Sequence, residues 1–274
     1  MARSDAVRSA RHLGGVADPA ERRRIERLWF PVSLVVLIVG WEVGVRVTQV
    51  NSVLVPTPLS VVQALWAGLS QWGPASFYPH FWRTLQEVLL GFAGGVVIGL
   101  LLGSLVALSA TAQTIIRPYI VMIEAIPKIA IAPLMVVWLG FGMESKVALA
   151  VLVTFFPIFV NTVSGMRSVP AERLELMQSM KASKSLTIRM VIFPSALPFI
   201  FAGLEIAAVY AVIAAIVSEF VSGQMGLGVL ILQANFRLDI ATVFAILILL
   251  GLMGIGMTKL IELARKRVIF WDGN

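Results

Sequence analysis

The sequence predicts an all-α polytopic membrane protein with six transmembrane helices and a cytoplasmic helix-turn-helix between the fourth and fifth helices. The first observation is composition: 58% of the residues are hydrophobic and 14% are charged, whereas soluble domains carry about 25% charged residues. The second is that six runs approach the ~20 mostly apolar residues that a membrane span needs. The six runs are Leu28–Val47, Leu85–Leu108, Tyr119–Leu139, Val147–Met166, Phe199–Val221 and Ile240–Leu263.

Residues 1–27 form a basic segment before the first span. No small-residue cleavage site follows the apolar run Leu34–Val39, so we expect the first span to be retained rather than removed as part of a signal peptide. We interpret the segment as a solvated tail that sets orientation. A specific lipid or partner site is the alternative.

Lysine and arginine are divided unequally between the two sides of the predicted spans. Cytoplasmic loops carry an excess of these residues, and one side holds seventeen of them against four on the other. This predicts that both termini and segment 167–198 are cytoplasmic. The larger group is Arg3, Arg8, Arg11, Arg22, Arg23, Arg24, Arg27, Arg117, Arg167, Arg173, Lys181, Lys184, Arg189, Lys259, Arg265, Lys266 and Arg267, and the smaller is Arg46, Arg83, Lys146 and Arg237. Because the basic residues are spread over loops, the net charge of +7 reflects topology, and nucleic acid is not an expected partner.

The second span carries glycines at intervals of four residues. Four-residue spacing keeps small residues on one slowly drifting helix face, and small residues let helices approach closely in lipid. We therefore expect this face to pack against another helix rather than bind a ligand. Its members are Gly91, Gly95, Gly99 and Gly103.

The third span contains Pro127 and Pro133, which indicate either a helix lining a pathway or simple kinking. Glu124 and Lys128 lie one turn apart in the favourable order for a helical ion pair. Ionisable residues at membrane depth usually face a cavity and pair with one another. Structural pairing is the favoured interpretation. The alternatives are a positive charge for an anionic substrate, at Lys128, and a membrane edge at Pro127.

The fifth span contains two carboxylates. Glu219 lies near its outer end and precedes the glycine-rich segment that starts at Gly223. We assign Glu219 either to an outer gate or to an exposed interfacial position. Glu205 lies deeper and is expected to be a structural partner.

Residues 167–198 are too polar to lie in hydrocarbon and must protrude from the membrane. Leu174, Met177 and Met180 recur at spacing three and form one apolar stripe. Ser183 can cap a second helix, which is predicted to stop before Pro194, because the residue preceding a proline avoids the α region. The segment therefore reads as two helices joined by a turn. It is either an interfacial connector or a docking element.

The same segment resembles the EAA loop of ABC-importer permeases. Glu175 aligns with the motif's glutamate, Leu176 and Met177 with its alanines, Lys181 with its glycine, and Ala182-Ser183, Phe193-Pro194 and Leu197-Pro198 with its later positions. Further stretches are similar to the nitrate/sulfonate/taurine branch of this family. These are Ala125–Leu134, Trp138–Gly142, Ser145-Lys146, Phe155–Pro157, Asn161, Glu219-Phe220 and Gly226–Gly228.

The resemblance implies an organisation and a function. Residues 28–84 would be the first span with a periplasmic segment, 85–264 the permease core, and 265–274 a cytoplasmic tail. The chain would be a multi-pass protein of the bacterial inner membrane that imports a small, nitrate- or sulfonate-like solute. The implied ATPase-coupling residues are Glu172, Leu174, Glu175, Met177, Gln178, Met180, Lys181, Ala182, Ser183 and Pro194, and the possible pathway residues are Glu124, Lys128, Asn161 and Glu219.

The resemblance also implies partners: an ATP-binding-cassette ATPase dimer that binds ATP and Mg²⁺, a second permease copy, and a periplasmic or lipid-anchored binding protein. No phosphate-binding loop motif occurs here, so ATP hydrolysis is expected elsewhere. An ion-gradient-driven secondary transporter is the alternative, although no duplicated half is visible. An intramembrane enzyme is disfavoured, because the chain has no Cys and only two His, leaving little material for a nucleophilic or metal site.

Overall fold

The computed structural model describes residues 19–271 apart from 52, 72 and 74–75, and in this part of the chain every regular element is a helix. Residues 1–18 of the predicted basic tail lie outside the described residues. The chain divides into two compact units, Met1–Val61 and Val62–Asn274. The first contains α2 (Pro19–Thr48), and α3 (Pro58–Ser70) begins in it. The second carries the remaining helices and the sites discussed below.

Five described helices are long and apolar enough to cross a membrane. A sixth candidate is a bent pair of helices, so the prediction of an all-α membrane protein is confirmed, with six spans when the pair is counted as one. The straight candidates are the apolar part of α2, α4 (Phe77–Leu108), α7 (Met143–Arg167), α10 (Phe193–Ser222) with the turns before it, and α12 (Ile240–Val268).

The third span is not the continuous helix that we expected over Tyr119–Leu139. It begins earlier, as α5 (Ala110–Ala125), and continues after a break as a 3-10 turn (Lys128–Ile131) and α6 (Ala132–Leu139). The two halves are bent by 79°. Ile126 is extended, with ψ 129°, because the ring of Pro127 excludes its predecessor from the helical region.

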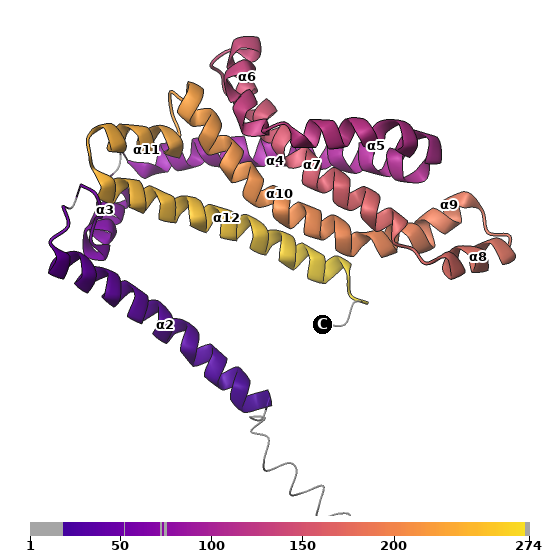
Figure 1. Ribbon diagram of the computed structural model, residues 1–274, viewed down its shortest axis with the longest axis horizontal. Helices are drawn as coiled ribbons and strands as arrows, with labels where there is room; N and C mark the ends of the chain where they lie inside the picture. Colours follow the sequence, from indigo (N-terminus) through magenta and orange to yellow (C-terminus); the bar gives the residue numbers. More distant parts are fainter. Residues whose placement is uncertain (1–18, 52, 72, 74–75, 272–274) are drawn as a thin grey trace, which may run out of the picture. The chain divides into compact units, whose positions relative to one another are not determined.

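The core of the second unit is built by α4, α7 and α10, which lie side by side (Figure 1). The helices α4 and α7 run parallel and meet through the glycine face: Gly91 lies against Ala150, Gly95 against Thr154, Gly99 against Ile158, and Gly103 against Thr162. All four glycines are buried. A Cβ at Gly99 would stand 2.9 Å from Ile158 side-chain atoms, so the close approach requires glycine.

The segment between α7 and α10 forms α8 (Ala171–Ser179) and α9 (Lys184–Thr187), with Ser183 capping α9 through the amide of Leu186. The prediction that the second helix stops before Pro194 is wrong. A π-helical turn, Ile188–Ile192, joins α9 to α10, so that Lys184–Ser222 forms one helical span of 39 residues. Pro194 is the second residue of α10 and follows the π-helical turn directly.

The helix α8 ends in a Schellman motif. The amide of Ala182 donates to the carbonyl of Met177 at 3.0 Å, and the amide of Lys181 donates to Gln178 at 2.8 Å. Lys181 adopts φ +54°, a left-handed conformation that costs a non-glycine residue about 1–2 kcal/mol. The turn therefore keeps the geometry of a glycine turn with a lysine in it.

The second unit has two ends, which we name by what they carry. The loop end is where α7 finishes and α8 and α9 lie. The network end is where α4 and α7 begin, where α10 finishes, and where α11 (Leu227–Phe236) packs against α4, α10 and α12.

Candidate functional site

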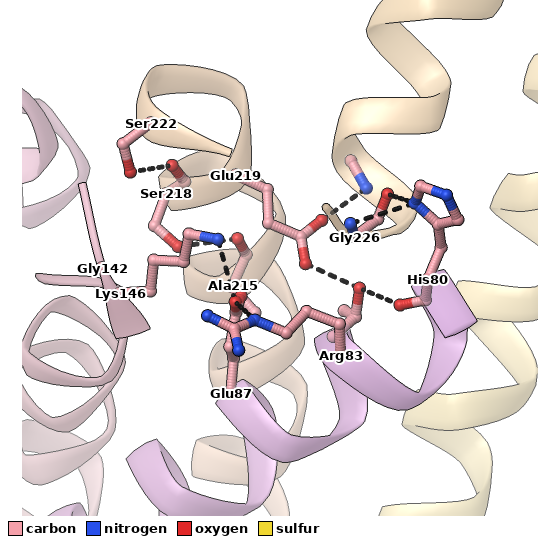
Figure 2. Close-up of polar contacts among 12 residues, drawn as sticks. His80, Arg83, Glu87, Gly142, Lys146, Ala215, Ser218, Glu219, Ser222 and Gly226 are labelled. Atoms are coloured by element: carbon pink, nitrogen blue, oxygen red, sulfur yellow. Dashed lines mark hydrogen bonds and ion pairs between the residues drawn. The ribbon is translucent and has the colours of Figure 1, made fainter. Parts of the chain in front are cut away.

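A buried ion pair joins α4 to α7 at the network end. The Lys146 ammonium lies 3.0 Å from Oε1 of Glu87, and these side chains are 2% and 0% exposed. The guanidinium of Arg83, one helical turn before Glu87, binds the same oxygen at 3.1 Å and is partly exposed. Figure 2 shows both cations converging on one carboxylate. Pairing offsets much of the cost of burying these charges, which would be severe for either one alone.

The neighbouring carboxylate, Glu219, holds the start of α11. Its Oε1 accepts the hydroxyl of Thr84 at 2.6 Å, and its Oε2 accepts the amide of Gly228 at 2.5 Å. Thr84 Oγ1 in turn accepts the amide of Leu227 at 2.8 Å. Nδ1 of His80 accepts the amide of Gly226 at 3.1 Å. The first amides of a helix lack intrahelical partners, and here side chains of α4 and α10 supply them (Figure 2).

The loop around Glu219 requires its glycines. Gly226 has φ +144°, a conformation that side chains rarely adopt, and a Cβ there would collide with the Glu219 carboxylate. A Cβ at Gly228 would lie 2.8 Å from Glu219 Oε2. The glycines therefore let the backbone wrap the carboxylate closely enough for amides to reach it.

One oxygen of this network lacks a donor. Among the described residues, Oε2 of Glu87 is buried without a hydrogen-bond partner. We name the residues His80, Arg83, Thr84, Glu87, Lys146 and Glu219 the outer network. It contains two cations and two carboxyls, and its contacts link α4, α7, α10 and α11.

Sequence reasoning missed most of the outer network. Glu219 was singled out, but its alternative as an exposed interfacial residue is wrong, since it is 1% exposed. The charge distribution predicts that Lys146 lies in a loop, but it lies inside α7. Glu87, for which the sequence predicts no role, lies near the start of the second predicted span. A carboxylate in an apolar run, with Arg83 four residues earlier, was the available signal.

The pathway candidate Asn161 and the expected structural partner Glu205 lie apart from the outer network. Asn161 donates to the carbonyl of Pro157 at 2.8 Å and packs beneath Gly203 at the contact between α7 and α10. Glu205 forms an ion pair with Arg265 at 3.5 Å, as a structural partner would. These contacts favour packing roles for both side chains.

Glu124 and Lys128 do not form the side-chain pair that we expected, although both belong to the described part of the chain. The Lys128 ammonium instead donates to the backbone carbonyl of Glu124 at 3.3 Å and lies 4.3 Å from the centroid of the Phe156 ring. The 79° bend explains the difference, because it breaks the continuous helix on which residues four apart are neighbours.

The residues implied in coupling lie on the loop-end segment. Glu172, Glu175, Gln178, Met180, Lys181 and Ser183 are exposed, whereas Leu174, Met177, Ala182 and Pro194 are half-buried. Leu176 and Met180, one turn apart, are 60% and 69% exposed and form an apolar strip on α8. The predicted stripe through Leu174 and Met177 faces inward instead.

Neither the loop nor the outer network carries a group of three His, Cys, Asp or Glu arranged to hold a metal ion, a statement that covers the described residues only.

A family model matches residues 95–269, and its description is "Binding-protein-dependent transport system inner membrane component". Curated relatives are similar over nearly their full length. The riboflavin transport system permease protein RibX of Chloroflexus aurantiacus is 34% identical, over 90% of this chain and 91% of its own. The formylaminopyrimidine transport permease protein ThiX of Halalkalibacterium halodurans is 35% identical, over 88% and 96%. The taurine transport system permease protein TauC of Escherichia coli is 28% identical, over 88% of each chain.

A solved structure has the same fold. A chain of the inward-facing MetNI methionine ABC transporter superposes with a TM-score of 0.59 at 21% identity, covering 70% of this chain and 94% of its own.

Proposed function

Because the chain belongs to the family of binding-protein-dependent transport system inner membrane components, we propose that it uses a separate ATPase to import a small solute. The chain is a permease component of an ABC transporter. One observation supports the coupling: a charged, exposed helix-turn-helix at the loop end is continuous with a membrane-spanning helix. Membership of this family favours ATP hydrolysis as the energy source over an ion gradient, which is the alternative that the sequence leaves open.

We propose that the helical span Lys184–Ser222 transmits motion from the ATPase to the opposite end of the bundle. Its 39 residues would extend about 58 Å at 1.5 Å per residue. One end adjoins α8, and the other ends in the outer network beside Glu219. Because α10 (Phe193–Ser222) is a continuous α-helix, it would carry a motion of α8 on an ATPase to the opposite end of the bundle. The π-helical turn Ile188–Ile192 is a natural hinge, because such turns often occur at functional sites in helices.

The surface of α8 suits a docking partner. The strip of Leu176 and Met180 is exposed, and the carboxylates Glu172 and Glu175 are exposed on the same short helix. An apolar strip beside charged groups is the composition expected of a protein interface. We propose that an ATPase dimer binds here, one subunit to each of two permease copies, and that the loop end and both termini face the cytoplasm.

The solute delivered by a binding protein is proposed to be a small organic or inorganic anion of the nitrate or sulfonate type. The taurine and aliphatic sulfonate permeases among the relatives support this class. The riboflavin and formylaminopyrimidine permeases are more similar in sequence and favour a heterocyclic solute as the second candidate.

Purification of the membrane protein with its co-expressed candidate ATPase tests the central claim. A stoichiometric complex whose ATP hydrolysis is stimulated by the binding protein in vesicles is expected. A permease that transports in vesicles without any ATPase would overturn the proposal and restore the ion-gradient alternative.

A further inference from the structure

A cavity of about 370 Å³ opens at the break in the third span. Its lining includes Glu124 and Lys128 from the break, Val153 from α7, and Tyr210 from α10. Phe156, beneath the Lys128 ammonium, is thirteen residues from the start of α7 and eleven from its end. At 1.5 Å per residue these are about 20 Å and about 16 Å, so the cavity lies near the middle of the membrane.

Among the described residues, the ammonium of Lys128 contacts groups that carry no net charge. These are a backbone carbonyl at 3.3 Å and an aromatic ring at 4.3 Å. Among the described residues, no carboxylate lies within ion-pair distance of it. The positive charge is therefore positioned by its neighbours without being neutralised by them.

A charge at this depth must face water or a ligand. A charged side chain is costly in hydrocarbon, and ionisable residues at this depth mark solute pathways. Glu124 is exposed and lines this cavity together with a second one of about 290 Å³, whose lining continues to Ser164 and Arg167 at the loop end. Two cavities that share a residue outline a route from the middle of the membrane toward the loop end.

We propose that Lys128 is a solute-contacting residue of the translocation pathway, and that its ammonium favours passage of small anions carrying a sulfonate, carboxylate or nitrate group. The inference rests on the proposed import function and identifies the residue that would select its solutes. Tyr210 also lines the cavity, and its phenol offers a hydrogen bond to the same group. Because Tyr210 belongs to the helix continuous with the loop end, a movement of that helix would change the cavity around a bound solute.

Charged thiol reagents test this proposal without knowledge of the solute, because the chain has no cysteine. Ile129 lines the cavity and is 44% exposed, so Ile129→Cys supplies a single thiol beside Lys128. The full chain, in complex with its ATPase in lipid nanodiscs, is treated with an anionic and with a cationic methanethiosulfonate. The ratio of the two modification rates reports the local potential.

Lys128→Gln is expected to lower the anionic-to-cationic rate ratio about sevenfold. One charge about 7 Å away in a water-like medium changes each rate roughly threefold, and it acts in opposite directions on the two reagents. Lys128→Arg should keep the ratio, and Glu124→Gln should raise it. An unreactive thiol in all four proteins would overturn the proposal, because the cavity would not be wet. An unchanged ratio in Lys128→Gln would also overturn it, because the charge would be neutralised.

The measurement requires neither ATP hydrolysis nor solute. A chain that showed the expected ratios and transported without an ATPase would refute the proposed drive and keep the inference about Lys128. ATP-driven uptake together with unchanged rate ratios would support the proposed drive and refute the inference about Lys128.

Discussion

The ion pair of Lys146 and Glu87 continues the contact between α4 and α7 by one helical turn beyond the glycine face. The ion pair joins residues 59 apart in sequence, and the same offset relates Gly91 to Ala150, Gly95 to Thr154, Gly99 to Ile158, and Gly103 to Thr162. A four-residue repeat on each of two parallel helices keeps this register over the whole contact. The pair therefore fixes the register at the network end, while the glycines permit the close approach that lets the charges meet.

The substitution Lys146→Met should destabilise the protein by about 3–5 kcal/mol, because it leaves a buried carboxylate with only the partly exposed Arg83. Thermal unfolding of purified protein measures the effect. The double variant Lys146→Met/Glu87→Gln should recover a large part of the loss, since the uncompensated charge is gone. A double variant no more stable than the single one would show that the pair contributes through something other than charge compensation.

Gly95→Leu or Gly99→Leu should prevent stable assembly, because any side chain there overlaps α7. The matched control is Gly256→Leu on α12, where no described atom of another helix lies within 4 Å of the position that a Cβ would occupy. Membrane yield and monodispersity on size-exclusion chromatography report assembly. Wild-type values for the α4 variants would refute the tight contact.

Glu219→Gln should be nearly as stable as the wild type, whereas Glu219→Ala should lose about 1–3 kcal/mol by leaving buried donors unsatisfied. The glutamine oxygen keeps the acceptor for the Gly228 amide. Its NH2 group takes the place of Oε1 and faces the Thr84 hydroxyl, which can accept it and donate instead to the carbonyl of His80. Hydrogen exchange of the Gly226–Gly228 amides should rise in the alanine variant only. Equal exchange in both variants would contradict the capping role.

Glu175→Arg should leave the protein folded, weaken ATPase association and abolish uptake, because reversing a docking charge places like charges in contact. Lys181→Gly should preserve coupling and stabilise α8 by about 1 kcal/mol, since glycine removes the strain at φ +54°. Uptake by vesicles with purified ATPase and binding protein measures both. Wild-type transport by Glu175→Arg would exclude this loop as the coupling element.

Single cysteines should label from opposite sides of the membrane at Ser179, on α8, and at Gln224, beyond α10. Both positions are exposed, whereas the neighbouring Ser222 is 5% exposed and bonded to Ser218, which makes it a poor probe. An impermeant reagent applied to intact cells should modify Gln224→Cys only. Modification of Ser179→Cys would reverse the proposed orientation.

Much of the architecture could be predicted from the sequence because its causes are local. Apolar runs of about 20 residues specify spans in any arrangement, and a glycine every four residues predicts a packed face before its partner is known. The protrusion of 167–198 follows from its polarity, and the cap at Ser183 from its own hydroxyl. The break at Ile126 also had a local cause in Pro127, which the continuous apolar run concealed.

Only the tertiary structure decided which distant groups meet. The pairing of Glu87 with Lys146 depends on the register between two helices, and the start of α11 is capped by side chains more than 100 positions away, His80 and Thr84. The solitary charge of Lys128 likewise results from a bend that separates it from the carboxylate of Glu124. Such contacts depend on how helices pack in three dimensions, which hydrophobic periodicity and local propensity along a single chain do not specify.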